Sequence, residues 1–136
     1  MTRLTLICWG FKMRPIKFRA WNDIYKMMIG WDTLQASPVL LMNILKGKVK
    51  HHKLMQFTGL QDKNGVDIYE GDLIKNKSGR ICLVVFNEYF ARFDSYVKFD
   101  GGRHAKSHGF KNTLWKSHVT VIGNIHQNPE LLGLNK

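Results

Sequence analysis

The residues whose types and spacing fit metal chemistry are His104 and His108. They lie four positions apart, a spacing at which two imidazole rings on one face of a helix bind the same metal ion. Gly101, Gly102 and Gly109 flank the pair and disfavour a helix. We therefore expect no metal site and no cofactor.

Three acids and one thiol are the remaining candidates for catalysis. Asp67, Glu70 and Asp72 could supply a pair of carboxylates, but acids beside a glycine such as Gly71 commonly accept hydrogen bonds from the backbone of a turn. Cys82 could act as a nucleophile with a histidine, but it lies in an apolar run, where a thiol is normally inert packing. We expect structural roles for all four side chains.

Motifs of the common enzyme classes are absent from the sequence. It contains no Gly-Lys-Ser/Thr phosphate loop, no His-Glu-x-x-His pair, no nucleophile elbow and no Cys-x-x-Cys pair. Each of these motifs supplies a defined part of a catalytic site. We expect that the protein is not an enzyme and that it has no catalytic residues.

Cationic side chains gather in two segments, 46–53 and 103–111, and aromatic side chains lie near them. Lysine and arginine contact phosphates, and aromatic rings stack on bases, so both segments are candidates for binding nucleic acid or another partner. The candidate binding residues are Lys46, Lys48, Lys50, His51, His52, Lys53, Arg103, His104, Lys106, His108 and Lys111, with Trp31, Phe110 and Trp115 as candidate stacking residues. The alternative is a solvated basic surface with no partner.

The positive charge is concentrated in the first part of the chain. Residues 1–60 carry ten lysines and arginines against two acids, residues 61–136 carry eleven against eight, and the net charge is +11. This asymmetry favours an anionic partner, with nucleic acid slightly ahead of an acidic protein surface. Open sheet edges and aromatic surfaces leave a homo-oligomer as a third hypothesis.

The most informative local pattern is the block 56–76. Asn64-Gly65 favours a hairpin tip, and Glu70-Gly71-Asp72 predicts a second turn between short strands. The run Ile81–Phe86 is apolar at every position, which predicts a strand buried on both faces. This strand is the best candidate for the centre of a core.

The N-terminal part predicts a β-hairpin. Residues 16–21 alternate, with Lys17, Arg19 and Trp21 on one face, which is typical of a half-exposed strand. Residues 25–31 form a candidate partner strand. For residues 33–45 we expect irregular structure or short strands, although Pro38 also permits the start of a helix.

The C-terminal part predicts further strands and a loop. Residues 87–99 are rich in aromatics and favour one or two strands, and residues 119–122 favour another. The glycine-bounded basic stretch 101–109 is typical of a loop. Pro129 suits the first turn of a short terminal helix or a docked tail.

Four pieces of the sequence carry a resemblance to a known family. They are MRPIKFRAW at 13–21, Lys26-Met27-Met28, the central block 56–76 and VIGNIHQNPELL at 121–132. Together they resemble the YopX family of small phage and prophage proteins, over about residues 13–132. The resemblance implies an all-β chain with an SH3-like barrel, a phage origin and an undefined biochemical role, and it supplies no catalytic residues. If the partner is a protein, we expect a host or phage protein, such as a component of replication, transcription or antiviral defence.

The expected fold is therefore mainly β, with an SH3-like barrel packed against an additional N-terminal β-hairpin region and a short C-terminal helix or tail. We expect three regions: an N-terminal extension at 1–12 that the family pattern does not require, an N-terminal β subdomain at 13–55, and the barrel region with its tail at 56–136. Met13 is an alternative to Met1 as the start used in the cell.

Cysteine usage and hydropathy predict the location of the protein. Cys8 and Cys82 lie in different settings, which argues against a structural disulfide. The chain has no apolar run near the roughly 20 residues that span a bilayer. We expect a protein of the host-cell cytoplasm that contacts no membrane.

Overall fold

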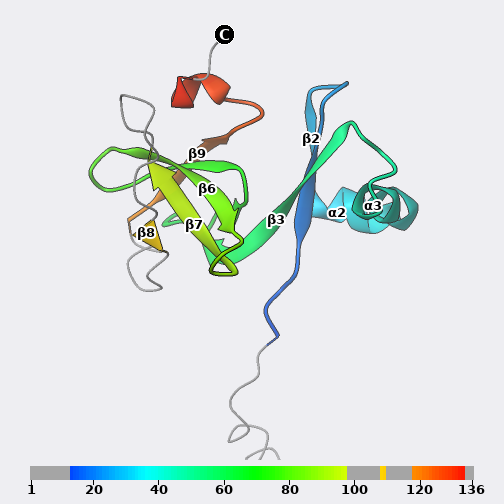
Figure 1. The fold of residues 1–136 in the computed structure, drawn as a ribbon, viewed down its shortest axis with the longest axis horizontal. Helices are drawn as coiled ribbons and strands as arrows, with labels where there is room; N and C mark the ends of the chain where they lie inside the picture. The colour runs from blue at the N-terminus through cyan, green and yellow to red at the C-terminus, as the bar shows by residue number, and fades with distance from the viewer. Residues whose placement is uncertain (1–12, 98–107, 110–117, 134–136) are drawn as a thin grey trace, which may run out of the picture.

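A computed structural model describes residues 13–97, 108–109 and 118–133 (Figure 1). Within them the elements are β1 (Phe18–Asn22), β2 (Met27–Ile29), α2 (Trp31–Ala36), α3 (Pro38–Leu45), β3 (His52–Gln61), β4 (Asp67–Tyr69), β5 (Asp72–Lys75), β6 (Ile81–Asn87), β7 (Arg92–Val97), β8 (His108–Gly109), β9 (Thr120–Asn124) and the 3₁₀ turn η1 (Pro129–Leu132). They form two sheets, in the orders β2-β1-β3-β4 and β8-β7-β6-β5-β9. The prediction of a mainly β fold is confirmed.

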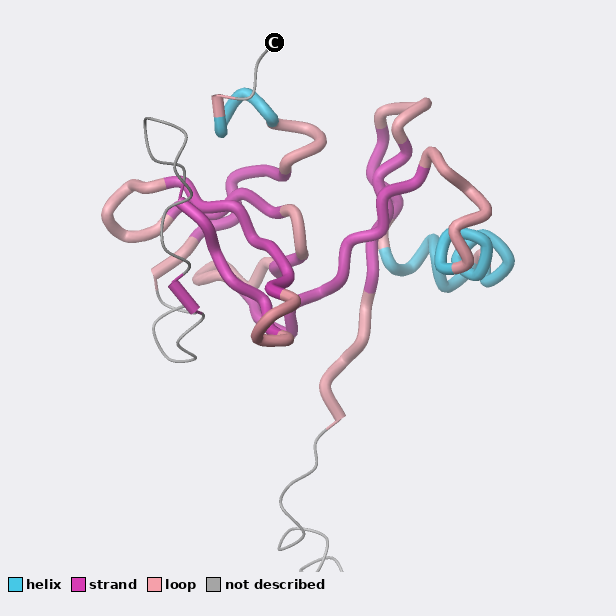
Figure 2. The backbone as a smooth tube through the Cα atoms, viewed as in Figure 1, coloured by secondary structure: helices cyan, strands magenta, loops and turns pink. Residues whose placement is uncertain are grey.

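The N-terminal hairpin is part of a sheet covered on one face by two short helices (Figure 2). β1 pairs with β2 and with β3, both antiparallel. Ala20 of β1, Leu34 of α2 and Ile44 of α3 form the buried centre of this lobe. The predicted hairpin is confirmed, and β1 is its central strand.

The prediction of irregular structure or short strands for residues 33–45 is wrong. Pro38 occupies the first turn of α3, where the fixed φ of proline and its missing N–H suit a helix start. Leu34 and Ile44 then lie on helix faces that meet Ala20 of the sheet. The helices form because this sheet face offers apolar surface to cover, which a local pattern does not reveal.

The prediction that β1 is half-exposed is also wrong, because both of its faces are covered. Trp21 is only 5% exposed and packs with Met55, Phe57 and Tyr69. On the same face, Arg19 pairs with Asp72 of β5. The cationic face of β1 is therefore turned toward the chain that follows β3.

β3 is the longest strand, and it runs from the first sheet to the side of the second (Figures 1 and 2). It pairs with β1 along residues 52–56 and with β4 at Phe57 and Gln61. The strand is continuous through residue 55, where the sequence predicted a boundary between two regions. The division into regions stays a prediction.

The turns of the central block lie where they were predicted. Gly65 and Gly71 both have φ near +80°, a conformation that glycine adopts without steric cost. A Cβ on Gly71 would lie 3.2 Å from the Met55 sulfur, so a larger residue here would also require the buried Met55 side chain to shift by a few tenths of an ångström. The Asn64-Gly65 hairpin joins β3 to β4, and Gly71 separates β4 from β5.

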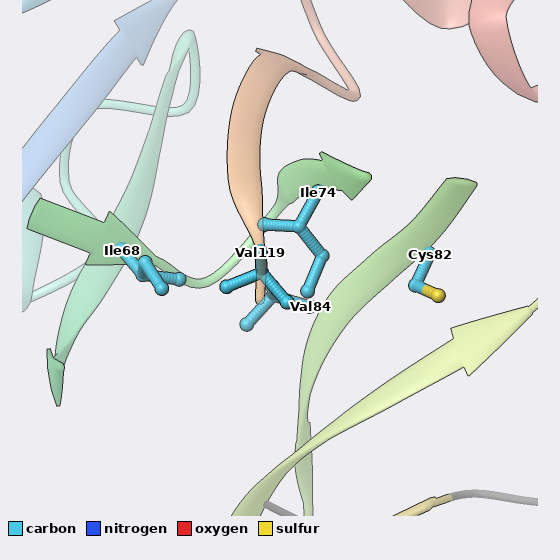
Figure 3. Packing of buried hydrophobic residues seen from close by; sticks show 5 residues of the cluster. All are labelled: Ile68, Ile74, Cys82, Val84 and Val119. Carbon is cyan, nitrogen blue, oxygen red and sulfur yellow. The ribbon is translucent and has the colours of Figure 1, made fainter. Parts of the chain in front are cut away.

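The second sheet curls into a half-barrel around a separate small core (Figure 3). Ile68, Ile74, Cys82, Val84 and Val119 form this cluster. The strand predicted at 81–86 is confirmed as β6, but the expectation that it is buried on both faces is wrong. Its residues alternate between buried and half-buried, and Phe86 is 42% exposed.

The C-terminal segment closes the fold. β9 pairs with β5, and η1 begins at Pro129 as the predicted short terminal helix. Among the described residues, no helix has the length and apolar character needed to cross a membrane.

Asp62 joins the β3–β4 turn to β9. Its carboxylate accepts hydrogen bonds from the backbone N–H groups of Asn64 (2.8 Å), Val66 (3.0 Å) and Val121 (3.0 Å). Burial acts to raise the pKa of this carboxyl, but the three N–H donors and Lys63 together lower it below its usual value. The charged form is thus favoured by folding.

We predict that Asp62→Ala costs about 3 kcal/mol of unfolding free energy at pH 7, because it leaves N–H groups without an acceptor. The lowered pKa implies that this contribution is complete above about pH 4, the usual unfolded value, and is lost as the pH falls through the folded value. Urea unfolding at pH 7, 4 and 3 measures both effects. Glu88→Ala, at an exposed turn, is the control and should change stability by less than about 0.5 kcal/mol. Equal effects of the two substitutions would contradict the assignment.

Two ion pairs on the same face of the N-terminal segment provide a second test. Arg19 and Asp72 keep 15% and 1% of their side-chain surfaces exposed, whereas Lys17 and Asp67 keep 31% and 25%. We predict that Arg19→Met lowers the free energy of unfolding by about 3 kcal/mol or more, because it leaves the buried Asp72 carboxylate without its partner. Lys17→Met should lower it by less than about 1 kcal/mol.

The buried pair should also show coupling in a double-mutant cycle. Asp72→Asn keeps an acceptor for the backbone N–H of Tyr69, so adding it to Arg19→Met should restore at least about 1 kcal/mol. Chemical denaturation of the four proteins at pH 7 measures the cycle. Additive effects would show that the two side chains do not act as a pair.

Candidate functional site

The cationic segment that precedes β3 is shaped by the end of α3. Gly47, at φ +66°, donates its N–H to Ile44 O, and the Lys48 N–H reaches back to Asn43 O. These two bonds form a Schellman motif, which stops the helix and redirects the chain. Val49 then packs against the core of the lobe. Because Gly47 and Val49 alternate with Lys46, Lys48 and Lys50, the three lysines are left exposed.

The β1–β2 turn lies beside this segment (Figure 1). The backbone N–H of Asp23 donates to His51 O at 2.8 Å, which ties the two segments together. The side chain of Asn22 accepts hydrogen bonds from the N–H groups of Ile24 and Tyr25, and so shapes the turn. Tyr25 is left 74% exposed, next to the exposed Lys26.

The Asp23–His51 hydrogen bond joins these two segments, and we call their exposed cationic residues, together with Tyr25, the cationic end: Tyr25, Lys26, Lys46, Lys48, Lys50, His51 and Lys53. Residues 22–27 and 46–53 hold five lysines and one aspartate, a net charge of +4. The aspartate, Asp23, lies 3.9 Å from the Lys53 ammonium, and the Lys53 and Asp23 side chains are 53% and 37% exposed. Among the residues that the structure describes, no ion pair is found for the other four lysines, Lys26, Lys46, Lys48 and Lys50.

The predicted binding residues of the first segment differ in their exposure to solvent. Lys46, Lys48, Lys50, His51 and Lys53 are exposed, as expected. His52 is half-buried, and its Nε2 lies 3.1 Å from the Asn22 amide nitrogen, so it supports the turn instead of facing a ligand.

Most of the second predicted segment lies outside the described residues. This applies to Arg103, His104, Lys106 and Lys111, and His108 is described only as part of β8.

The one described aromatic residue that was predicted to stack on bases is not available for this role. Trp31 packs against Phe18, with ring centroids 6.1 Å apart, so it belongs to the lobe core. Phe110 and Trp115 lie outside the described residues. Tyr25 and Lys26 were missed. Their proximity to Lys50 follows from the Asp23–His51 hydrogen bond, for which a single sequence carries no signal.

Two of the three acids and the thiol have structural contacts. Asp67 accepts hydrogen bonds from Lys17 and Gln61, and Asp72 accepts one from Tyr69 N–H and pairs with Arg19. Burial raises the pKa of the Cys82 thiol, which disfavours the nucleophilic thiolate. Within the described part of the chain, no group of three or more His, Cys, Asp or Glu residues could hold a metal ion.

A cleft of about 210 Å³ opens between the two sheets. Leu54 and Met55 of β3 line one side, and Leu83 and Val85 of β6 line the other. The remaining lining residues are Glu70, Gly71, Val84, Ile125 and His126. Burial lowers the pKa of His126, whose ring is stacked on Trp21 with centroids 5.9 Å apart. The lining is mainly apolar, and it offers no arrangement of nucleophile and base.

Comparison with known proteins identifies a family. The family model described as YopX protein matches residues 17–133. Among solved structures, the crystal structure of protein EF1440 from Enterococcus faecalis is similar, with 24% sequence identity and a TM-score of 0.47, and the alignment covers 87% of this chain and 98% of that chain. The comparison with curated proteins gives no match. Because the family model spans most of the sequence, the chain belongs to the YopX family.

Proposed function

We propose that this protein is a phage-encoded, non-enzymatic binding module of the host cytoplasm, and that its cationic end contacts nucleic acid. The observation that carries the proposal is the placement of five lysines and the exposed Tyr25 on two segments joined by a hydrogen bond. Lysines neutralise phosphates, and an exposed tyrosine ring stacks on an unpaired base. Single-stranded DNA or RNA therefore suits this surface better than a duplex.

The local structure argues against a merely solvated basic surface. The Schellman motif, the buried anchor Val49 and the side chain of Asn22 hold the lysine-bearing backbone in place. A fixed backbone reduces the entropy lost when several lysines bind one strand at once.

A protein partner is the alternative, because an acidic protein surface would also complement the lysines. Its contacts would not require a stacking base, and so would not depend on Tyr25 in the same way. The two hypotheses can therefore be separated by the response to salt and to loss of the aromatic ring.

We predict that the protein binds a fluorescein-labelled dT12 oligonucleotide with an affinity that falls steeply with salt. Lys48→Glu/Lys50→Glu should weaken binding at least tenfold and make the slope of log K against log[salt] shallower by about 1.4 or more, since each phosphate contact to a single strand contributes about 0.7. Fluorescence anisotropy between 50 and 300 mM NaCl measures both.

The control for this double variant is Lys75→Glu/Lys77→Glu, which makes the same charge change at exposed positions of the β5–β6 hairpin. It should leave most of the affinity and most of the slope intact. Equal loss of affinity in the two variants would show that net charge alone accounts for the binding. Absence of binding to dT12 at 50 mM NaCl would reject the proposal.

A second prediction concerns base stacking. Tyr25→Ala should lose about 1–3 kcal/mol of dT12 binding, whereas Tyr25→Phe should bind like the parent protein, because the ring and not the hydroxyl makes the contact. Tyr89→Ala removes a tyrosine that is 98% exposed on the β6–β7 turn, and it should have no effect. If Tyr25→Ala binds dT12 as tightly as Tyr89→Ala does, the stacking role is wrong.

A further inference from the structure

One edge of β3 is left open where the strand passes the cleft. The register pairs Arg19 with Met55 and Ala20 with Leu54. The bonds Asp23 N–H to His51 O and Phe57 N–H to Lys17 O show which pairs exchange hydrogen bonds. In an antiparallel ladder these pairs alternate, so Met55 bonds to β1 while Leu54 directs its N–H and C=O away from it.

The opposite edge of β3 is only partly occupied. β4 begins its pairing at Phe57, beyond this stretch. Gln56 O accepts the Glu70 N–H, and the His52 N–H makes a 3.4 Å contact with Val49 O. Among the described residues, no backbone partner is found for the N–H and C=O of Leu54 or for the N–H of Gln56. Backbone groups in this alternating order match another extended strand.

The apolar walls of the cleft meet this open edge. Leu83 and Val85 lie on the half-buried face of β6, opposite the face that contributes Cys82 and Val84 to the core. Ile125 adds a third apolar side chain to the lining. A strand laid along β3 would place alternate side chains against these walls, because successive side chains of a strand point to opposite faces.

The two ends of the open edge differ in charge. Lys53 is exposed next to Leu54, and His126 lies in the cleft lining. Glu70 stands at the other end, bonded to Gln56 through its N–H. An acidic side chain is therefore favoured only at the end near Lys53. This polarity distinguishes a peptide from a nucleic acid strand, which would bring a phosphate close to Glu70 as well.

We propose that the open edge of β3 and the adjoining cleft bind an extended peptide segment by β-strand addition. The segment carries apolar side chains at alternate positions and an acidic residue at the end next to Lys53. Main-chain hydrogen bonds to Leu54 and Gln56 supply the affinity, and the walls formed by Leu83, Val85 and Ile125 select the side chains. This site adjoins the cationic end at Lys53, but its main-chain and apolar contacts do not depend on the proposed binding of nucleic acid.

The test begins with selection from a library of random ten-residue peptides displayed on a carrier protein. The expected result is enrichment of sequences with β-branched or aromatic residues at alternate positions, an acidic residue at one end and no proline in between. Failure to enrich any peptide above the level retained by the Val85→Lys variant would overturn the proposal.

The best peptide is then synthesised with single N-methyl groups at successive positions. Strand addition predicts that methylation at every second residue weakens binding at least tenfold, while methylation at the intervening residues has little effect, because only alternate N–H groups face β3. Hydrogen exchange should slow at least tenfold at the amides of Leu54 and Gln56 and stay unchanged at that of Met55. Tolerance of methylation at all positions, or no added protection at Leu54, would overturn the proposal.

Matched variants locate the site. Val85→Lys projects a long charged side chain into the cleft and should weaken peptide binding at least tenfold, whereas Val39→Lys, on the exposed face of α3, should not. Sedimentation of the protein without peptide tests whether a second copy of the chain occupies the open edge instead. A dimer that Val85→Lys converts to monomer, with Leu54 and Gln56 already protected in the dimer, would assign the edge to a second copy of the chain and overturn the peptide proposal.

Discussion

A buried ion pair between Arg19 of β1 and Asp72 of β5 joins the two sheets. Burial raises the pKa of the Asp72 carboxyl, since removal from water disfavours its charge, while the Arg19 guanidinium and the Tyr69 N–H act against this effect. The guanidinium also lies 4.6 Å from the centre of the Tyr69 ring. A different placement of the sheets would leave a buried charge without its partner, a cost of several kcal/mol. The pair thus favours one arrangement of the sheets over others that bury as much apolar surface.

The remaining contacts across β1 follow from this arrangement. Lys17 and Trp21 share the face of Arg19, and they meet Asp67 and the ring of His126 respectively. Ala20 faces the other way, toward α2 and α3. β1 therefore has a hydrophobic cluster on each of its two faces. The cleft exists because β3 extends beyond β1 toward the second sheet, and one stretch of the edge of β3 stays open.

The predictable part of the fold was encoded in short segments. Asn64-Gly65 and Gly71 specify their turns through local backbone preference, and Ile81–Phe86 is a strand by composition alone. The helices at 31–45 were missed because their apolar faces acquire a partner only once β1 and β3 have paired. Lys17 and Arg19 gave the pattern of an exposed strand face, because the acids that bind them lie 50 and 53 residues away.

The same limit applies to the candidate site. The lysines between α3 and β3 could be found by their density, and His52 could not be separated from them because its contact with Asn22 crosses two strands. Tyr25 joins the cationic end through the pairing of β1 with β3, and the open edge at Leu54 depends on which residues of β3 exchange bonds with β1. Both features depend on strand register, which long-range packing decides.

The central functional claim is that one end of the first sheet binds a nucleic acid strand. Titration of the ¹⁵N-labelled protein with dT12, followed by amide chemical shifts, tests it most directly. The account predicts that the largest shifts fall in residues 23–26 and 46–53, with little change at the β5–β6 and β6–β7 turns. Largest shifts at either of those turns, or none at all, would contradict it.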